Sequence, residues 1–242
     1  MPKSNKKALS LPLSISQNYL TSKEIIRRLI RIAGLCKDDY VVEIGTGRGH
    51  ITRELARVCA HVDTYEIDRI LIEHVSSKIN TSNVNMYCRD FLKVSLPKEK
   101  IYKIFANIPF SRTSEIIDKI ITTNNIPEEA WLIMEKGAAK RFAGKPYDSR
   151  VSLILKPFYE INIHYHFKRD DFHPAPGVDV VLLCLKKKNS PDINFSQKRI
   201  YKSFVENQFI KFYYKKAKHL SRETLYIQWL CLFRRLYRDN KR

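Results

Sequence analysis

The chain has 242 residues, enough for one large domain or for one domain with a small appendage. Its 44 Lys and Arg residues against 25 Asp and Glu residues give a net charge of +19, which favours a polyanionic partner, most often nucleic acid. The alternatives are a generally basic protein or a patch that binds a membrane surface. No stretch approaches the roughly 18 uninterrupted apolar residues of a membrane helix, and the start of the chain lacks the apolar core of a signal peptide. We therefore expect a cytoplasmic protein.

The cysteines and histidines do not suggest a metal site or disulfides. No two cysteines form a Cys-x-x-Cys pair, and no carboxylate or cysteine pattern accompanies His164 and His166, which share one face of a predicted strand. We expect most of the thiols to be buried as small apolar side chains. The cysteines are Cys36, Cys59, Cys88, Cys184 and Cys231.

The first part of the chain is predicted to be an arm followed by a helix. Residues 1–15 are basic and irregular. Thr21 and Glu24 are spaced as a capping box, apolar residues follow at helical spacing, and Gly34 is a typical residue after a helix end. The helix is therefore predicted to begin at Thr21 and to end at Gly34.

A glycine-rich turn joins a short buried strand, residues 40–44, to the helix that follows. Glycines let a ligand approach the backbone closely, and a helix N-terminus offers free N–H groups. The glycines Gly45, Gly47 and Gly49 have the spacing Gly-x-Gly-x-Gly, which differs from the spacing in dinucleotide-binding folds. A P-loop requires Lys-Ser or Lys-Thr after the glycines, and neither pair follows here. Taken alone, the turn is weak support for a ligand.

Two carboxylates stand at the ends of the next two predicted strands, 62–67 and 84–88. Glu66 comes 21 residues after Gly45, close to the spacing of roughly 20 residues at which an acid binds ribose hydroxyls. Asp90 also stands at the end of a strand, where it can accept a hydrogen bond from an adenine amino group. The alternative is that both are solvated acids at strand ends.

The strand at 101–106 runs into a turn that suits a planar group with an NH2, such as the edge of adenine. Asn107 offers a neutral amide oxygen. Pro109 pushes Ile108 into an extended conformation, so that the Ile108 carbonyl can point out of the turn. Phe110 adds a flat apolar face. The alternative is a polar turn beside a core Phe.

The following segments continue the α/β alternation. We predict a helix at 113–121, a strand at 130–134, a short helix at 135–142, and two closing strands at 160–167 and 178–185. The loop between the closing strands carries Phe172. This ring is either a second aromatic plate facing Phe110 or, as the safer interpretation, part of the core.

A basic C-terminal segment follows the boundary at 186–191. From Lys187 to Arg242 there are 15 basic and 4 acidic residues, and apolar residues recur at helical spacing. We predict two or three helices whose basic outer faces contact phosphates, unless those faces are simply solvated. The proposed contacts are Lys211, Lys215, Lys216, Lys218, Arg222, Arg234, Arg235 and Arg238.

Taken in order, these motifs resemble the rRNA adenine-N6 methyltransferases, and most closely the Erm group that methylates 23S rRNA. The similarity extends over nearly the whole chain. It rests on the segments 16–20, 43–49, 66–68, 89–91, 107–110, 135–142 and 172–176. It implies an α/β fold: a Rossmann-like S-adenosylmethionine-dependent methyltransferase domain with a seven-stranded, mostly parallel sheet at 16–188, and a small all-helical RNA-binding domain at 189–242.

The resemblance also implies roles for single residues. The segment around Asn18 and Leu20 closes over S-adenosylmethionine, and Ile67 lies against its adenine. The glycines of the turn line the amino-acid end of the cofactor, Glu66 takes its ribose hydroxyls, and Asp90 takes its amino group. The catalytic turn, Asn107, Ile108, Pro109 and Phe110, together with Phe172, holds the target adenine.

The implied reaction is methyl transfer to N6 of a 23S rRNA adenine near the peptidyl-transferase centre, which gives macrolide, lincosamide and streptogramin B resistance. We expect a monomer that needs no metal. The family usually has Tyr where Phe110 stands, so stacking is kept and a hydroxyl contact is lost. The alternatives are a small-subunit rRNA dimethyladenosine transferase and a non-catalytic rRNA-binding assembly factor.

Overall fold

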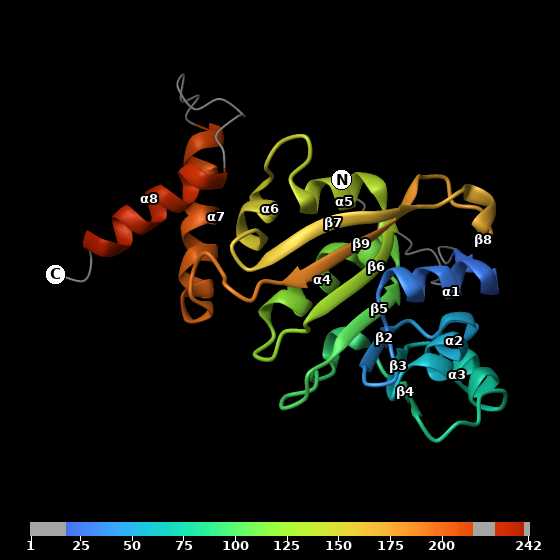
Figure 1. The fold of residues 1–242 in the computed structure, drawn as a ribbon. Coiled ribbons are helices and arrows are strands. Elements are labelled where there is room, and N and C mark those ends of the chain that lie inside the picture. The colour runs from blue at the N-terminus through green and yellow to red at the C-terminus, as the bar shows by residue number, and fades with distance from the viewer. Residues whose placement is uncertain (1–17, 215–225, 240–242) are drawn as a thin grey trace, which may run out of the picture.

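The computed structural model describes residues 18–214 and 226–239. Its centre is a seven-stranded sheet in the order β4-β3-β2-β5-β6-β9-β7 (Figure 1). Adjacent strands from β4 through β6 are parallel, and β9 is antiparallel to both β6 and β7. The strands are β2 (Tyr40–Ile44), β3 (His61–Glu66), β4 (Val84–Cys88), β5 (Lys103–Asn107), β6 (Glu129–Glu135), β7 (Tyr159–His166) and β9 (Val180–Lys187). The expected fold class is confirmed.

Helices cover both faces of this sheet, because alternate strand residues are apolar on each side. Val42 belongs to the core on one face and Val41 to the core on the other. A separate antiparallel pair joins β1 (Tyr19–Leu20) to β8 (Phe172–His173). The helices are α1 (Lys23–Ile32), α2 (His50–Val58), α3 (Arg69–Ser76), α4 (Thr113–Thr122), α5 (Lys136–Ala143), α6 (Arg150–Leu155), α7 (Lys198–Tyr214) and α8 (Tyr226–Asp239).

Several element boundaries differ from those expected. The strands at 40–44 and 84–88 are confirmed with the same bounds, whereas β5 begins two residues later than predicted. The capping residue of α1 is Ser22 and not Thr21, because the Ser22 hydroxyl accepts a hydrogen bond from the Ile25 N–H. Gly34 follows the end of this helix as expected, with a left-handed φ of 60°.

The expectation that most thiols are buried is wrong. Cys59 and Cys184 are buried, but Cys36, Cys88 and Cys231 are exposed, and all five are free. Cys88 ends the edge strand β4, and Cys231 lies on the outer side of α8, so apolar neighbours in the sequence did not place these thiols in the core.

The two C-terminal helices pack onto the same core as the sheet. Tyr201 and Val205 of α7 and Phe233 of α8 are at most 2% exposed and belong to the cluster that contains Leu183 of β9. The Asp192 carboxylate accepts hydrogen bonds from Lys188 and from the Tyr226 hydroxyl at 2.7 and 2.8 Å. The core is therefore continuous across the boundary expected near residue 189.

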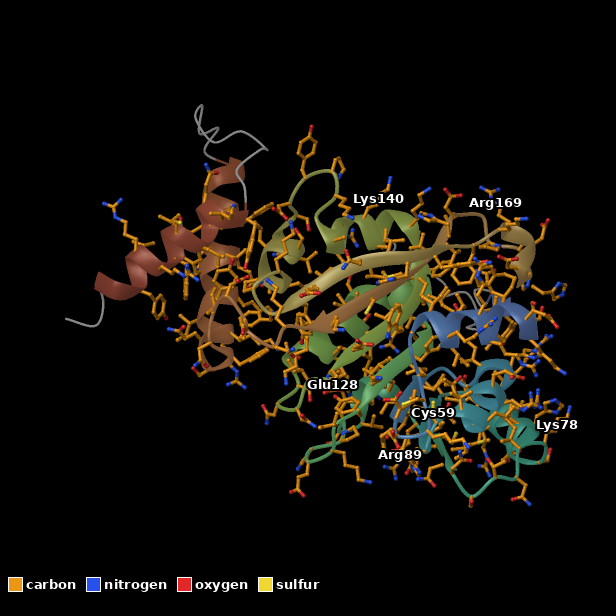
Figure 2. The ribbon with its side chains drawn as sticks, in the orientation of Figure 1. Cys59, Lys78, Arg89, Glu128, Lys140 and Arg169 are labelled. Atoms are coloured by element: carbon orange, nitrogen blue, oxygen red, sulfur yellow. The ribbon has the colours of Figure 1, made fainter. Side chains whose placement is uncertain are left out.

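Basic side chains project from several sides of the molecule. Lys140 and Arg169 lie above the sheet in Figure 2, and Lys78 and Arg89 lie on the opposite side. Among the predicted phosphate contacts, Arg234 and Arg235 are exposed on α8. Lys215, Lys216, Lys218 and Arg222 lie outside the described residues, and the side chains of Lys211 and Arg238 are not described. No helix in the described part of the chain is long and apolar enough to cross a membrane.

Candidate active site

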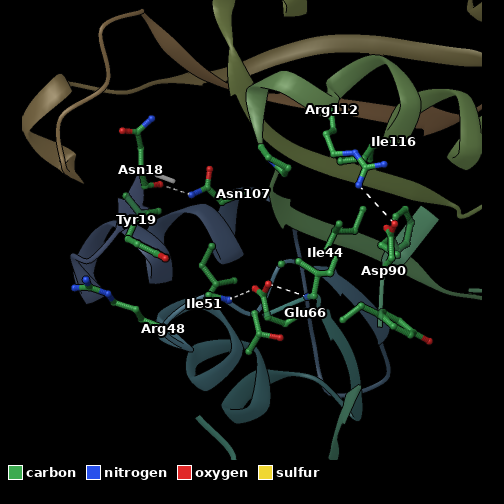
Figure 3. Close-up of a pocket in the computed structure, with 18 of the residues that line it drawn as sticks. Asn18, Tyr19, Ile44, Arg48, Ile51, Glu66, Asp90, Asn107, Arg112 and Ile116 are labelled. Atoms are coloured by element: carbon green, nitrogen blue, oxygen red, sulfur yellow. Dashed lines mark hydrogen bonds and ion pairs between the residues drawn. The ribbon is translucent and has the colours of Figure 1, made fainter. Parts of the chain in front are cut away.

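A cavity opens at the carboxyl-terminal ends of β2, β3 and β5 (Figure 3). Because β2 lies between β3 and β5, the strand order reverses here, and this is where open α/β sheets bind their ligands. The predicted site residues that line the cavity are Asn18, Leu20, Gly45, Gly47, Glu66, Ile67, Asp90, Asn107, Pro109 and Phe110. The sequence motifs therefore converge on one site, although Gly49, Ile108 and Phe172 lie behind its lining.

The turn after β2 needs glycine at two positions. Gly49 caps α2 with a φ of 73°, and a Cβ there would lie 2.6 Å from a methyl carbon of Val75. Gly47 has a φ of 52°, and a Cβ there would lie 3.0 Å from the Tyr19 ring. The glycines thus allow α3 and the β1 segment to approach the turn closely.

Glu66 is held in place by three backbone N–H groups. Its Oε1 accepts from Ile67 and Asp68 at 2.9 and 3.1 Å, and its Oε2 accepts from Gly47 at 2.9 Å. A carboxylate has about four lone-pair positions. Oε2 therefore keeps one position for a hydroxyl donor at the cavity, while the other contacts fix the side chain, which is only 4% exposed.

Asp90 has a cationic partner that the sequence analysis missed. Its Oδ1 accepts from the Leu92 N–H at 2.9 Å, and its Oδ2 lies 3.6 Å from Arg112 Nη1 (Figure 3). Arg112 also pairs with Glu115 at 2.9 Å and lines the cavity. The position of Arg112, two residues after Phe110, was the sequence signal that placed it near the site. Its pairing with Asp90 could not be foreseen, because it depends on the fold.

The Asn107 amide is oriented by the backbone of the β1 segment. Asn107 Nδ2 donates to the Asn18 carbonyl oxygen at 2.8 Å, a contact between residues 89 positions apart (Figure 3). Because a carbonyl oxygen can only accept, the NH2 group must face Asn18. Oδ1 is consequently directed away from Asn18 and has no hydrogen-bond donor in the described part of the chain.

The other members of the catalytic turn lie at different depths. Pro109 and Phe110 line the cavity. Ile108 is 2% exposed, and its N–H donates to the Ile133 carbonyl at 3.2 Å, which fixes the turn against β6. Phe172 is 4% exposed, pairs with Leu20 across β1 and β8, and belongs to the core. The core interpretation of Phe172 is therefore confirmed.

Tyr19 and Arg48 also line the cavity, and the sequence analysis gave them no role. The Arg48 guanidinium carbon lies 4.8 Å from the centre of the Tyr19 ring, an attractive cation–π arrangement. Burial raises the pKa of Tyr19, so its hydroxyl is protonated at neutral pH. Tyr19 lies in the segment 16–20 and Arg48 in the segment 43–49, so the sequence motifs already pointed to their neighbourhood.

Glu43 lies behind the glycine-rich turn and is a buried carboxyl with an incomplete hydrogen-bond set. It is 1% exposed, its Oε2 accepts from Thr52 Oγ1 at 2.7 Å, and its Oε1 has no partner. Burial raises its pKa to about 8, and the Thr64 and Thr52 side chains oppose this. Glu43 is therefore mostly uncharged at pH 7. No group of three or more metal-binding side chains occurs in residues 18–214 and 226–239.

Comparison with known proteins agrees with this geometry. The ribosomal RNA adenine dimethylase family matches residues 10–226. An rRNA adenine N-6-methyltransferase of Limosilactobacillus reuteri is 36% identical over 83% of this chain and 81% of its own length. A ribosomal RNA small subunit methyltransferase A of Mycoplasmopsis pulmonis is 32% identical over 80% of this chain and 77% of its own. The crystal structure of 23S rRNA methyltransferase ErmE superposes with a TM-score of 0.72 at 29% identity, over 80% of this chain and 79% of that one.

The fold and the strand-end cavity define a methyltransferase of the Rossmann-like, S-adenosylmethionine-dependent class. The chain belongs to the ribosomal RNA adenine dimethylase family.

Proposed function

We propose that the protein transfers a methyl group from S-adenosylmethionine to N6 of an adenine in 23S rRNA, in the macrolide site of the peptidyl-transferase region, and so confers macrolide, lincosamide and streptogramin B resistance. The observation that carries this proposal is the Asn107 amide, which is anchored through Nδ2 and leaves Oδ1 free for a donor at the cavity. Support for the 23S target comes from the similarity to ErmE.

The residues of the cavity fit S-adenosylmethionine. Glu66 Oε2 has a lone-pair position for a ribose hydroxyl, Asp90 offers an acceptor for the adenine amino group, and Ile67 supplies an apolar contact for the ring. The cofactor supplies a methyl group on a sulfonium, which is already electrophilic. The protein therefore needs to provide position and hydrogen-bond acceptors, and no covalent nucleophile.

The catalytic turn provides those acceptors. In the proposed mechanism, Asn107 Oδ1 and the main-chain carbonyl of Ile108, to which no described group donates, accept hydrogen bonds from the two N6 protons of the target adenine although the Ile108 side chain is buried. These bonds favour a pyramidal nitrogen and stabilise the charge that develops there. The target nucleotide must leave its stack at a cost of a few kcal/mol. Stacking on Phe110, at roughly 1–3 kcal/mol for a base on an aromatic ring, offsets this cost.

The second candidate is methylation of small-subunit rRNA. Curated relatives named ribosomal RNA small subunit methyltransferase A match this chain at 32% and 34% identity. These values are close to the 36% identity of the rRNA adenine N-6-methyltransferase of Limosilactobacillus reuteri. The dimethyladenosine transferase of Plasmodium falciparum also superposes with a TM-score of 0.67 at 28% identity, over 77% of this chain and 69% of that one. A non-catalytic assembly factor would need neither the Glu66 cradle nor the anchored Asn107.

Labelled S-adenosylmethionine and two substrates test the proposal, namely protein-free 23S rRNA and unmethylated 30S subunits. Label in the 23S adenine of the macrolide site would support it. Label only in the 30S subunits would transfer the same chemistry to the second candidate. Absence of label in both, with the cofactor still bound, would contradict both rRNA targets.

Replacing Asn107 should separate chemistry from binding. We expect Asn107→Ala to abolish methyl transfer, because the acceptor Oδ1 is lost, while RNA affinity stays nearly unchanged. Single-turnover transfer and filter binding to protein-free 23S rRNA measure the two effects. Asn124→Ala, on an exposed loop residue, is the matched control. Full transfer by Asn107→Ala would refute the mechanism.

A further inference from the structure

An exposed aromatic ring stands on the loop between α5 and α6. Tyr147 is 54% exposed, and it is the only aromatic residue among the large apolar side chains exposed in the described part of the chain. It makes no hydrogen bond or ring contact with any described residue. Its neighbours Lys145 and Pro146 are exposed as well. Nothing in the fold of the described residues therefore requires an aromatic ring here.

The loop that carries Tyr147 is braced on both sides. The Lys145 N–H donates to the Lys140 carbonyl at 2.9 Å, and the Ser149 hydroxyl donates to the Arg141 carbonyl at 2.7 Å. Asp148, directly after Tyr147, is tied to Lys156 at 2.5 Å. A ring on a braced loop loses little conformational freedom when a flat ligand stacks on it.

Gly144 allows this bracing. Its φ is 66°, and a Cβ at this position would lie 2.3 Å from Asp148 Oδ1 and 2.8 Å from the Ser152 hydroxyl. The Ser152 hydroxyl in turn donates to Asp148 Oδ1 at 2.9 Å. The loop thus closes tightly around Gly144 and leaves the Tyr147 side chain outside.

The surroundings of Tyr147 are strongly basic. From Lys136 to Lys156 the chain has six basic residues and a single acidic residue, Asp148, which Lys156 neutralises. Four of the basic side chains are exposed and have no carboxylate partner in the described residues. They are Lys140, Arg141, Lys145 and Arg150.

This surface extends from the active site toward the C-terminal helices. Asn107 pairs with Ile133 of β6, and α5 begins three residues later at Lys136. The eight residues of α5 span about 12 Å. The loop follows α5, and α6 then packs against α7 (Figure 1). Lys140 projects outward from α5 in Figure 2. A polyanion that enters the cavity can therefore follow α5 to the loop.

We propose that the α5–α6 loop binds single-stranded rRNA beside the target adenine, with Tyr147 stacking an unpaired base and the four exposed cations contacting the backbone phosphates. This inference rests on the proposed function, because it takes the polyanion to be the methylated rRNA. Proteins bind single-stranded nucleic acid by this combination of a stacking ring and a positive groove. An acidic protein surface would use the cations but would not need the ring.

Affinity for protein-free 23S rRNA, measured by filter binding, tests the stacking role. Tyr147→Ala should weaken binding about tenfold, because base stacking on an aromatic side chain is lost. Tyr147→Phe should bind like the wild type, because its ring is kept. Equal weakening by both variants, or unchanged binding by Tyr147→Ala, would overturn the inference. Calorimetry with S-adenosylmethionine should give the wild-type affinity for both variants. Unfolding curves of the two variants that match that of the wild type exclude a folding defect.

Salt dependence tests the phosphate contacts. Lys145→Ala should reduce the slope of log affinity against log salt by about one, and Lys78→Ala, on the opposite side of the molecule, should leave it unchanged. Equal effects of the two lysines would show a diffuse charge effect and overturn this part. If the wild type binds and methylates 23S rRNA and Tyr147→Ala binds it with the same affinity, the inference about the loop is refuted and the proposed function stands. Wild-type protein that binds no rRNA would refute the proposed function, and this inference with it.

Discussion

Glu43 is the residue at which burial most clearly changes the chemistry of a side chain. It stands two residues before Gly45, and no hydrogen-bond donor in the described structure reaches its Oε1. Burial raises its pKa from 4.5 to about 8. Between these two pH values the folded state therefore keeps a proton that the unfolded state releases. Because only the unfolded carboxyl ionises in this range, folding becomes less favourable as the pH rises.

We expect the stability of the wild type to fall relative to that of Glu43→Gln as the pH rises from about 4.5 to about 8. The slope should be at most about 1.4 kcal/mol per pH unit, because one proton is involved. The Gln side chain stays uncharged at every pH, so residue 43 makes no pH-dependent contribution to the stability of Glu43→Gln. Urea unfolding of both proteins at pH 5, 6.5 and 8 measures the difference, with the exposed Glu128→Gln as control. Parallel stability curves for wild type and Glu43→Gln would show that Glu43 does not carry the proton.

Some site residues were predictable because their signal is local. Gly45, Glu66 and Asp90 each stand at the end of a strand or within two residues after it, and apolar residues mark these strands in the sequence. Parallel strands then bring their ends together. Arg112 was not predictable in the same way, because its partner Asp90 lies on another strand end. The Asn107 amide was predicted as an acceptor, but its orientation depends on the Asn18 carbonyl, which only the folded chain brings near.

At the scale of elements, the turn between β2 and α2 is shaped by its contact with α3. Gly49 caps α2, and the methyl groups of Val75 from α3 occupy the space that a side chain at Gly49 would need. Sequence spacing predicts the turn, but it does not show that α3 closes over it. The contact couples the glycine-rich turn to the segment that follows Glu66.

Gly49→Ala should lower the free energy of unfolding by about 2–5 kcal/mol. A left-handed backbone costs a non-glycine residue about 1–2 kcal/mol, and overpacking against Val75 adds about 1–3 kcal/mol. In the double variant Gly49→Ala with Val75→Ala, the cost of overpacking should disappear, whereas the cost of the left-handed backbone should remain. Denaturant unfolding of the wild type, the two single variants and the double variant gives the coupling energy. Strict additivity of the two substitutions would mean that the turn and α3 do not press on each other.

At the scale of the whole molecule, the basic segment after residue 188 is not set apart from the sheet by a gap in the core. The boundary at 186–191 was predicted from charge and Pro191, and the chain there does leave β9. Tyr201 and Phe233 nevertheless pack in the same cluster as the strands. Deleting residues 189–242 would expose this core, so point substitutions separate RNA binding from stability more cleanly.

Phe233→Ala and Arg235→Ala lie on the same helix and should act on different properties. Phe233 is 2% exposed, so its truncation should cost about 3–5 kcal/mol and should lower the midpoint of a single unfolding transition for the whole chain. S-adenosylmethionine should raise that midpoint in both the wild type and Phe233→Ala, because a ligand of the sheet stabilises everything that unfolds with it. Arg235 is exposed, so Arg235→Ala should keep the midpoint and weaken binding to 23S rRNA. An early transition in Phe233→Ala that does not respond to the cofactor would instead show that the C-terminal helices unfold as an independent domain.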